Sequence, residues 1–100
     1  MSQQYIGFLI GRRASWPDDM TEPEEKIMNE HFFYLTDLVA KRKVILAGPC
    51  LELRKGIVIL ETDSELEARQ IMDNDPSVKK GLHRYEMYPM RVSLLANKNH

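Results

Sequence analysis

The sequence contains little cysteine, no excess of charge of either sign and no long hydrophobic run. Its one cysteine, Cys50, cannot form an intrachain disulfide, so we expect a reducing cytoplasm as its compartment. Fourteen basic and fifteen acidic side chains give a net charge of −1, a balance that offers no basic excess to bind nucleic acid. The apolar run at 5–10 is too short for a signal peptide or a membrane span. We therefore predict that neither nucleic acid nor a membrane is a partner.

Motifs that bind metals and nucleotide cofactors are also missing. The chain has no CxxC pair, and no two of its three histidines stand at the spacing that places metal ligands on one face of a helix. Its five glycines are scattered instead of being gathered in a phosphate-binding loop. The sequence thus predicts no metal and no cofactor, so any chemistry must come from ordinary side chains.

The composition is that of a globular domain. The chain has 100 residues, of which 43% are hydrophobic and 29% are charged. We expect a single domain over residues 1–100, with a core at 5–94 and a frayed C-terminal tail at 95–100. A domain this short buries a modest share of its surface, so pairing with a second copy would add stability.

Capping residues predict two main helices. Thr21 and Ser64 are each followed three residues later by a glutamate, a pattern typical of helix N-termini. The first helix is expected to end near residues 41–43, whose positive charges favour a helix C-terminus. The second is expected to end at Asp75, because a residue before proline disfavours helical geometry. A further short turn at 76–80 follows.

Four apolar segments predict strands. Residues 5–10 are aromatic or β-branched at most positions, so we expect this strand to be buried on both faces. Gly48 and Pro49 are expected to end the second strand, and Pro89 inside the last one indicates a bulge or an edge position. The expected strands cover residues 5–10, 44–47, 56–60 and 83–94.

The order strand, helix, strand, strand, helix, strand predicts an α+β fold of the ferredoxin-like βαββαβ type. Right-handed crossovers place the two helices on one face of a four-stranded antiparallel sheet. The other face is then uncovered, and the strands at 5–10 and 56–60 make it apolar. Soluble proteins usually hide such a face, so we expect a homodimer in which two sheets pack together with two-fold symmetry.

His31 and Asp75 are the leading candidates for chemistry. His31 lies on the apolar stripe of the first helix, between Met28 and Leu35, so its imidazole should face the sheet and could exchange protons near neutral pH. Asp75 could accept a hydrogen bond from it. A purely structural role also stays open for each residue, and the local sequence pattern alone favours it over a catalytic role. His31 could be a core histidine with a local partner, and Asp75 could be the N-cap of the turn after Pro76.

Three segments in this order resemble the YCII (YciI-like) family: the helix around His31, the strand end at 47–49, and Asp75 with its following proline. The resemblance covers residues 5–94 and implies a dimeric α+β barrel, related in fold to muconolactone isomerase. It also implies a pocket whose active-site pair is His31 and Asp75. A shared fold does not by itself define a reaction.

Other side chains are expected near the same pocket. Gly48 and Pro49 would shape its wall, with glycine permitting close approach of the backbone. Arg13 and Trp16 could clamp an anionic or aromatic ligand, or could instead form a dimer or rim contact. Cys50 could act as a nucleophile beside the pair, or could simply pack at a strand end.

These observations lead to two kinds of function. The first is a small cofactor-free enzyme of the YCII type that uses His31 and Asp75 for acid–base chemistry on a small organic molecule. The second is a non-catalytic dimer module that binds a small ligand or another protein. A measurement of turnover separates the two.

Overall fold

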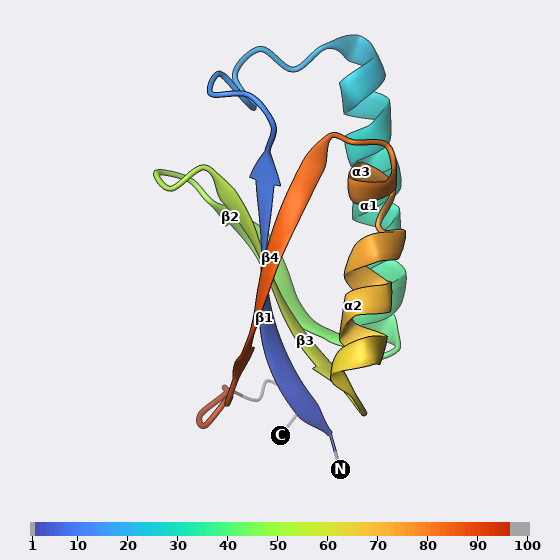
Figure 1. Cartoon of the computed structure of the whole chain (residues 1–100), viewed down its shortest axis with the longest axis vertical. Coiled ribbons are helices and arrows are strands. Elements are labelled where there is room, and N and C mark those ends of the chain that lie inside the picture. Colours follow the sequence, from blue (N-terminus) through green and yellow to red (C-terminus); the bar gives the residue numbers. More distant parts are fainter. Residues whose placement is uncertain (1, 97–100) are drawn as a thin grey trace.

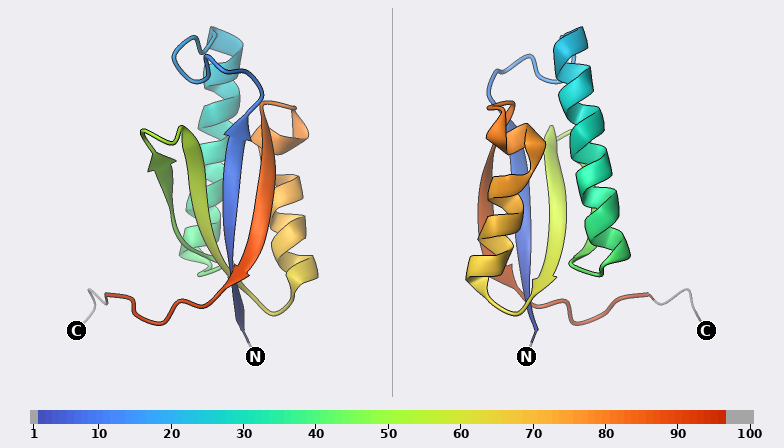
Figure 2. Two further views of the ribbon diagram at one scale, coloured as in Figure 1. Left: turned by 60° about the vertical axis from the view of Figure 1, so that its left-hand side comes forward. Right: turned by 90° about the vertical axis from the view of Figure 1, so that its right-hand side faces the viewer.

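The computed structural model describes residues 2–96 and shows one antiparallel sheet (Figure 1). The sheet order is β2-β3-β1-β4, and the helices cover a single face of it (Figure 2). This arrangement confirms the predicted fold class. Residues 97–100 of the expected C-terminal tail lie outside the described part of the chain. The elements are β1 (Gln3–Gly11), α1 (Glu22–Ala40), β2 (Val44–Cys50), β3 (Lys55–Thr62), α2 (Glu65–Asn74), α3 (Pro76–Lys79) and β4 (His83–Met90).

The two long helices begin where the capping residues predict. Thr21 Oγ1 accepts a hydrogen bond from the backbone N–H of Glu24 at 3.4 Å, and the Glu24 carboxylate accepts one from Thr21 N at 2.9 Å. Ser64 Oγ likewise accepts from the N–H of Glu67 at 3.1 Å. α1 ends just before the basic residues at 41–43. No helix within residues 2–96 is both long and apolar enough to cross a membrane.

The end of β2 differs from the prediction. The strand does not stop at Gly48 but runs on to Cys50, and Pro49 lies opposite Gly56 of β3. β2 is an edge strand, and proline is tolerated there because an edge strand needs a ladder partner on one side only. The rule that proline ends a strand is therefore wrong at this position.

The last strand is shorter than expected. β4 ends at Met90, whereas the sequence pattern predicts continuation to Leu94. Pro89 lies opposite Tyr5 near the end of this second edge strand. Its predicted edge position is confirmed.

Side chains of β1 alternate between two environments. Tyr5 and Leu9 are 3% and 2% exposed and pack in the core beneath the helices. Ile6 and Phe8, on the opposite face, are only partly buried. The expectation that this strand is buried on both faces is wrong for the chain by itself, because the helices cover one face only (Figure 2).

Candidate active site

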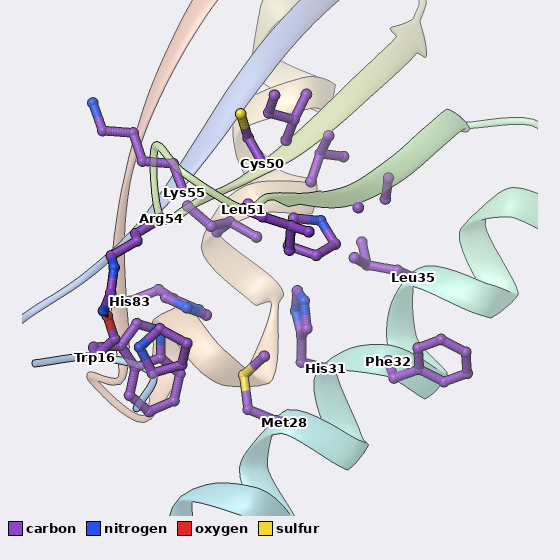
Figure 3. A pocket seen from close by; sticks show the side chains of 18 of the residues that line it. Trp16, Met28, His31, Phe32, Leu35, Cys50, Leu51, Arg54, Lys55 and His83 are labelled. Carbon is purple, nitrogen blue, oxygen red and sulfur yellow. The ribbon is translucent and has the colours of Figure 1, made fainter. Parts of the chain in front are cut away.

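A pocket of about 860 Å³ lies between α1, the sheet and the loop that joins β1 to α1 (Figure 3). His31 and His83 are the two histidines in its wall. Such a pocket favours a small, largely apolar ligand that a few polar groups orient. The apolar residues of the wall include Leu9, Met28, Phe32, Leu35, Pro49 and Val58.

The structure brings His31 and Asp75 into direct contact. Nδ1 of His31, on α1, lies 2.7 Å and 2.9 Å from the two carboxylate oxygens of Asp75, at the junction of α2 and α3. Asp75 is 1% exposed. Because an ionised carboxylate only accepts hydrogen bonds, Nδ1 is the donor, and neutral His31 keeps a lone pair on Nε2. Nε2 is then the nitrogen that can take up a proton.

Asp75 is held in place by the short helix that it caps. Its Oδ1 accepts hydrogen bonds from the backbone N–H and the hydroxyl of Ser77, both at 2.9 Å. Ser77 is fully buried, and Pro76 at the first helical position needs no N–H partner. The two interpretations of Asp75 are therefore compatible in geometry, because one carboxylate both caps α3 and accepts from His31. A buried carboxylate with several donors is fixed in position.

His83, at the start of β4, is the second imidazole of the pocket wall. Its ring centroid lies 5.9 Å from that of His31 and 5.5 Å from that of Trp16, in edge-to-face contacts. The residue is 4% exposed, and its Nδ1 is a buried side-chain atom without a hydrogen-bond partner among the described residues. Burial, assisted by the nearby His31, lowers the pKa of His83 to about 4 against an opposing effect of Asp75. His83 is therefore neutral at neutral pH.

The sequence analysis did not identify His83 as a candidate pocket residue. A signal was available in the period of the strand. His83 and Met87 alternate with exposed positions, and Met87 packs in the core. Side chains four residues apart on a strand point to the same face, so the apolar Met87 could have indicated that His83 faces the helices.

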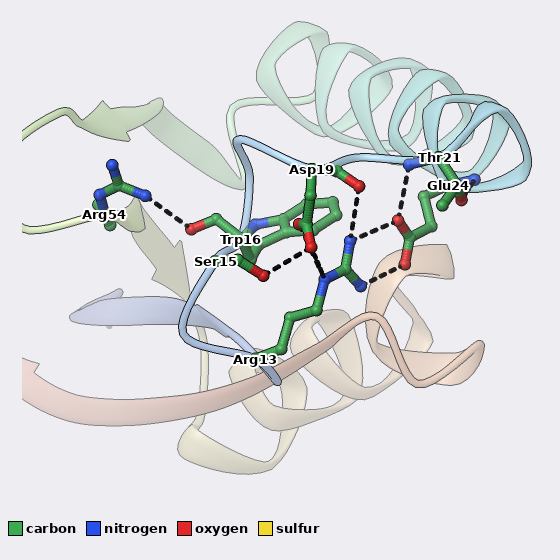
Figure 4. Close-up of polar contacts among 7 residues, drawn as sticks. All are labelled: Arg13, Ser15, Trp16, Asp19, Thr21, Glu24 and Arg54. Atoms are coloured by element: carbon green, nitrogen blue, oxygen red, sulfur yellow. Dashed lines mark hydrogen bonds and ion pairs between the residues drawn. The ribbon is translucent and has the colours of Figure 1, made fainter.

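Arg13 does not line the pocket, and its side chain extends toward Glu24 on α1 (Figure 4). Its guanidinium pairs with Glu24 at 2.7 Å and with Asp19 at 2.9 Å, and it stands over the ring of Trp16 at 5.4 Å. The hydrogen bonds raise the pKa of Arg13 and lower that of Glu24 to about 2. With its donors engaged by two carboxylates, Arg13 ties the first loop to the start of α1. The expected clamp on a ligand does not match this geometry.

Trp16 is the part of the first loop that does border the pocket. It is 6% exposed, and its side chain packs so closely on Gly11 that a Cβ there would stand 2.8 Å from the Cβ of Trp16. Arg54, in the turn between β2 and β3, donates to the Trp16 carbonyl at 3.3 Å (Figure 4). It also pairs with Asp18 at 2.7 Å. The loop and the turn thus meet beside the pocket.

The β2 residues expected in the pocket wall are found there. Gly48, Pro49 and Cys50 all border the pocket. Apart from Gly48 itself and its two chain neighbours, no atom of residues 2–96 lies within 4 Å of the position that a Cβ of Gly48 would take. No close approach among these residues therefore requires glycine at this site. Cys50 is a partly buried free thiol. Within residues 2–96, no three His, Cys, Asp or Glu side chains are grouped closely enough to hold a metal ion.

The fold and the pocket define a small α+β protein in which a partly buried histidine is paired with a buried aspartate. The model of the YCII-related domain matches residues 10–91, and the chain belongs to this family. The matched segment contains all three helices, most of the sheet and the three residues His31, Asp75 and His83. A search of curated proteins finds no match to the chain.

Proposed function

We propose that this protein is a small cofactor-free enzyme that performs acid–base chemistry on a small organic molecule. The observation that carries the proposal is the contact of 2.7 Å between His31 and Asp75 at the wall of an apolar pocket. Asp75 fixes the tautomer of His31 and stabilises its charged form, so Nε2 can accept a proton from a bound molecule and return it. This arrangement suits abstraction of a proton next to a carbonyl group.

Binding without turnover is the second candidate. The apolar wall of the pocket would hold a small molecule whether or not a proton moves. In that case His31 and Asp75 would only orient the ligand. The two candidates differ in turnover and not in affinity.

Exchange of methyl protons of acetophenone in D₂O, followed by NMR, tests the proposal without a known substrate. The wild-type protein is expected to accelerate exchange, and His31→Asn to lose about 100-fold or more of that acceleration. Asparagine can still donate to Asp75 from the position of Nδ1 but has no counterpart of Nε2. Acetophenone that binds without accelerated exchange would favour the binding candidate. Full exchange activity in His31→Asn would remove His31 as the base.

We also propose that two copies pair through the uncovered face of the sheet. Partly buried Ile6, Phe8 and Ile57 lie on this face, and Leu46 of β2 is 48% exposed. A two-fold pairing would bury these apolar side chains. Sedimentation equilibrium is expected to give a dimer for the wild type and a monomer for Phe8→Glu. A monomeric wild type would contradict the pairing.

A further inference from the structure

We propose that His83 is a second ligand-contacting residue of this pocket, a neutral imidazole that hydrogen-bonds the carbonyl oxygen of a small apolar ligand beside His31. The two rings extend toward one another across the pocket in Figure 3, with 5.9 Å between their centroids. His31 comes from α1 and His83 from β4, so they approach the pocket from different layers of the fold. The assignment rests on the proposed use of this pocket for small carbonyl compounds.

The hydrogen bonding of the two imidazoles separates their roles. The proton on His31 is held at Nδ1 by Asp75. No side-chain hydrogen bond within residues 2–96 fixes the tautomer of His83, and its Nδ1 is buried without a partner. An imidazole left without protein partners in a buried place is costly, since such polar groups are normally satisfied. Because Nδ1 is enclosed, a ligand oxygen would accept the N–H of the other ring nitrogen, Nε2, which the described residues leave without a hydrogen-bond partner.

The charge on each ring completes the assignment. His31 has a carboxylate at hydrogen-bond distance that stabilises an imidazolium, whereas His83 has Trp16 and His31 as its ring neighbours. Two neighbouring titratable groups in such different surroundings take different roles, one moving the proton and the other staying neutral. A neutral N–H donor can polarise a carbonyl group while His31 removes the adjacent proton.

A matched pair of ligands tests this role. Acetophenone and cumene are similar in size, but the carbonyl oxygen of the first is replaced by a hydrogen and a methyl group in the second. We would measure the dissociation constants of both by NMR titration of the full chain, as wild type, as His83→Phe and as His31→Asn. Phenylalanine keeps an aromatic ring between Trp16 and His31 but has no nitrogen. The ¹⁵N shifts of the His83 ring in the wild type give a second readout that needs no variant.

The expected result is a five- to tenfold loss of the preference for acetophenone over cumene in His83→Phe, the size of one hydrogen bond. In His31→Asn the preference should stay within about twofold. Acetophenone, and not cumene, should shift the His83 ring nitrogens. An unchanged preference in His83→Phe with unshifted nitrogens would make His83 a packing residue only. Loss of preference in His31→Asn alone would assign the oxygen to His31, and failure of acetophenone to bind would exclude this ligand class.

The binding ratio also separates this inference from the proposed enzyme activity. If wild-type protein prefers acetophenone through His83 but does not exchange its methyl protons, the enzyme proposal fails and the ligand contact stands. If exchange depends on His31 while His83→Phe binds both ligands as the wild type does, the enzyme proposal stands and the ligand contact of His83 fails.

Discussion

His31 and His83 border the same pocket but have different surroundings. The His31 side is a hydrogen-bonded network in which Asp75 accepts from an imidazole and from Ser77. The His83 side is an aromatic contact with Trp16, and Nδ1 of His83 has no partner among the described residues. His31 therefore has a carboxylate at hydrogen-bond distance, and His83 does not.

The comparison shows how a small fold can assign two roles to one type of side chain. A carboxylate beside an imidazole favours its charged form, while burial without a counter-charge favours the neutral form. The helix layer supplies the carboxylate, because Asp75 stands at the α2–α3 junction. The sheet supplies the buried neutral ring at the start of β4. Four changes would break or sharpen this contrast, and they are given from the largest expected effect to the smallest.

Removal of the carboxylate should destroy the His31 side. We expect Asp75→Ala to lower the free energy of unfolding by about 3–5 kcal/mol, because it leaves buried donors on His31 and Ser77 unsatisfied. Urea denaturation measures the change. Asp73→Ala, two residues earlier, is the matched control, since exposed Asp73 accepts only from the Tyr85 hydroxyl. Equal losses in the two variants would contradict a special role for the Asp75 network.

The His83 side should make stability depend on pH. The folded pKa of about 4 lies below the ordinary value of 6.5, so the unfolded chain takes up a proton in this interval that the folded chain does not. The free energy of unfolding should therefore fall by about 2–3 kcal/mol as the pH decreases from 6.5 to 4. Urea denaturation at several pH values should show this fall in the wild type and not in His83→Phe. Both proteins keep His31 and Asp75, so the comparison isolates His83. Identical pH slopes would exclude His83 as the source.

Displacement of Trp16 should disturb His83 while leaving the pair at Asp75 intact. Gly11→Ala places a Cβ 2.8 Å from the Trp16 Cβ, and we expect it to cost about 1–3 kcal/mol and to shift the tryptophan fluorescence. Gly48→Ala is the control, because no atom lies within 4 Å of its added Cβ. Unchanged fluorescence in Gly11→Ala would show that the loop accommodates the methyl group without moving Trp16.

The smallest effect is expected from Tyr34, which connects α1 to α2 near the histidine–aspartate pair. Its hydroxyl donates to the carbonyl of Ile71 at 2.7 Å, and burial together with the charge of Asp75 raises the pKa of Tyr34 to about 12. Tyr34→Phe should cost about 1 kcal/mol, the value of one hydrogen bond. Thermal unfolding measures the loss. A variant as stable as the wild type would show that this bond adds nothing to the position of α1.

The parts of the fold that could be predicted are those with local causes. Helix starts at Thr21 and Ser64 follow from side chains that bond the backbone three residues away. The extension of β2 through Pro49 and the end of β4 at Met90 could not be predicted in this way. Each depends on where the neighbouring strand stops offering partners, and the residues of the strand itself do not specify that point.

For the candidate site, too, the local features were predictable from the sequence and the distances between side chains were not. The spacing of the first helix placed His31 on its inward face, and the proline after Asp75 marked a cap. The distance between the two side chains depends on how the helices pack, and the resemblance to the YCII family had already paired them. The ion pairs of Arg13 could not be predicted, because its two carboxylate partners come together only when the loop folds back on α1.

The sequence by itself determined the order of elements, the faces that are apolar and the residues that cap each helix, because these depend on neighbours a few positions apart. Only the tertiary structure decided which histidine has a carboxylate and which has none. Asp75 is far from His31 along the chain, and Trp16 is far from His83. The contacts within these two pairs arise when the helices and the first loop pack against the sheet. Since the charge of a buried imidazole depends on such contacts, the division of roles between His31 and His83 is a property of the folded chain.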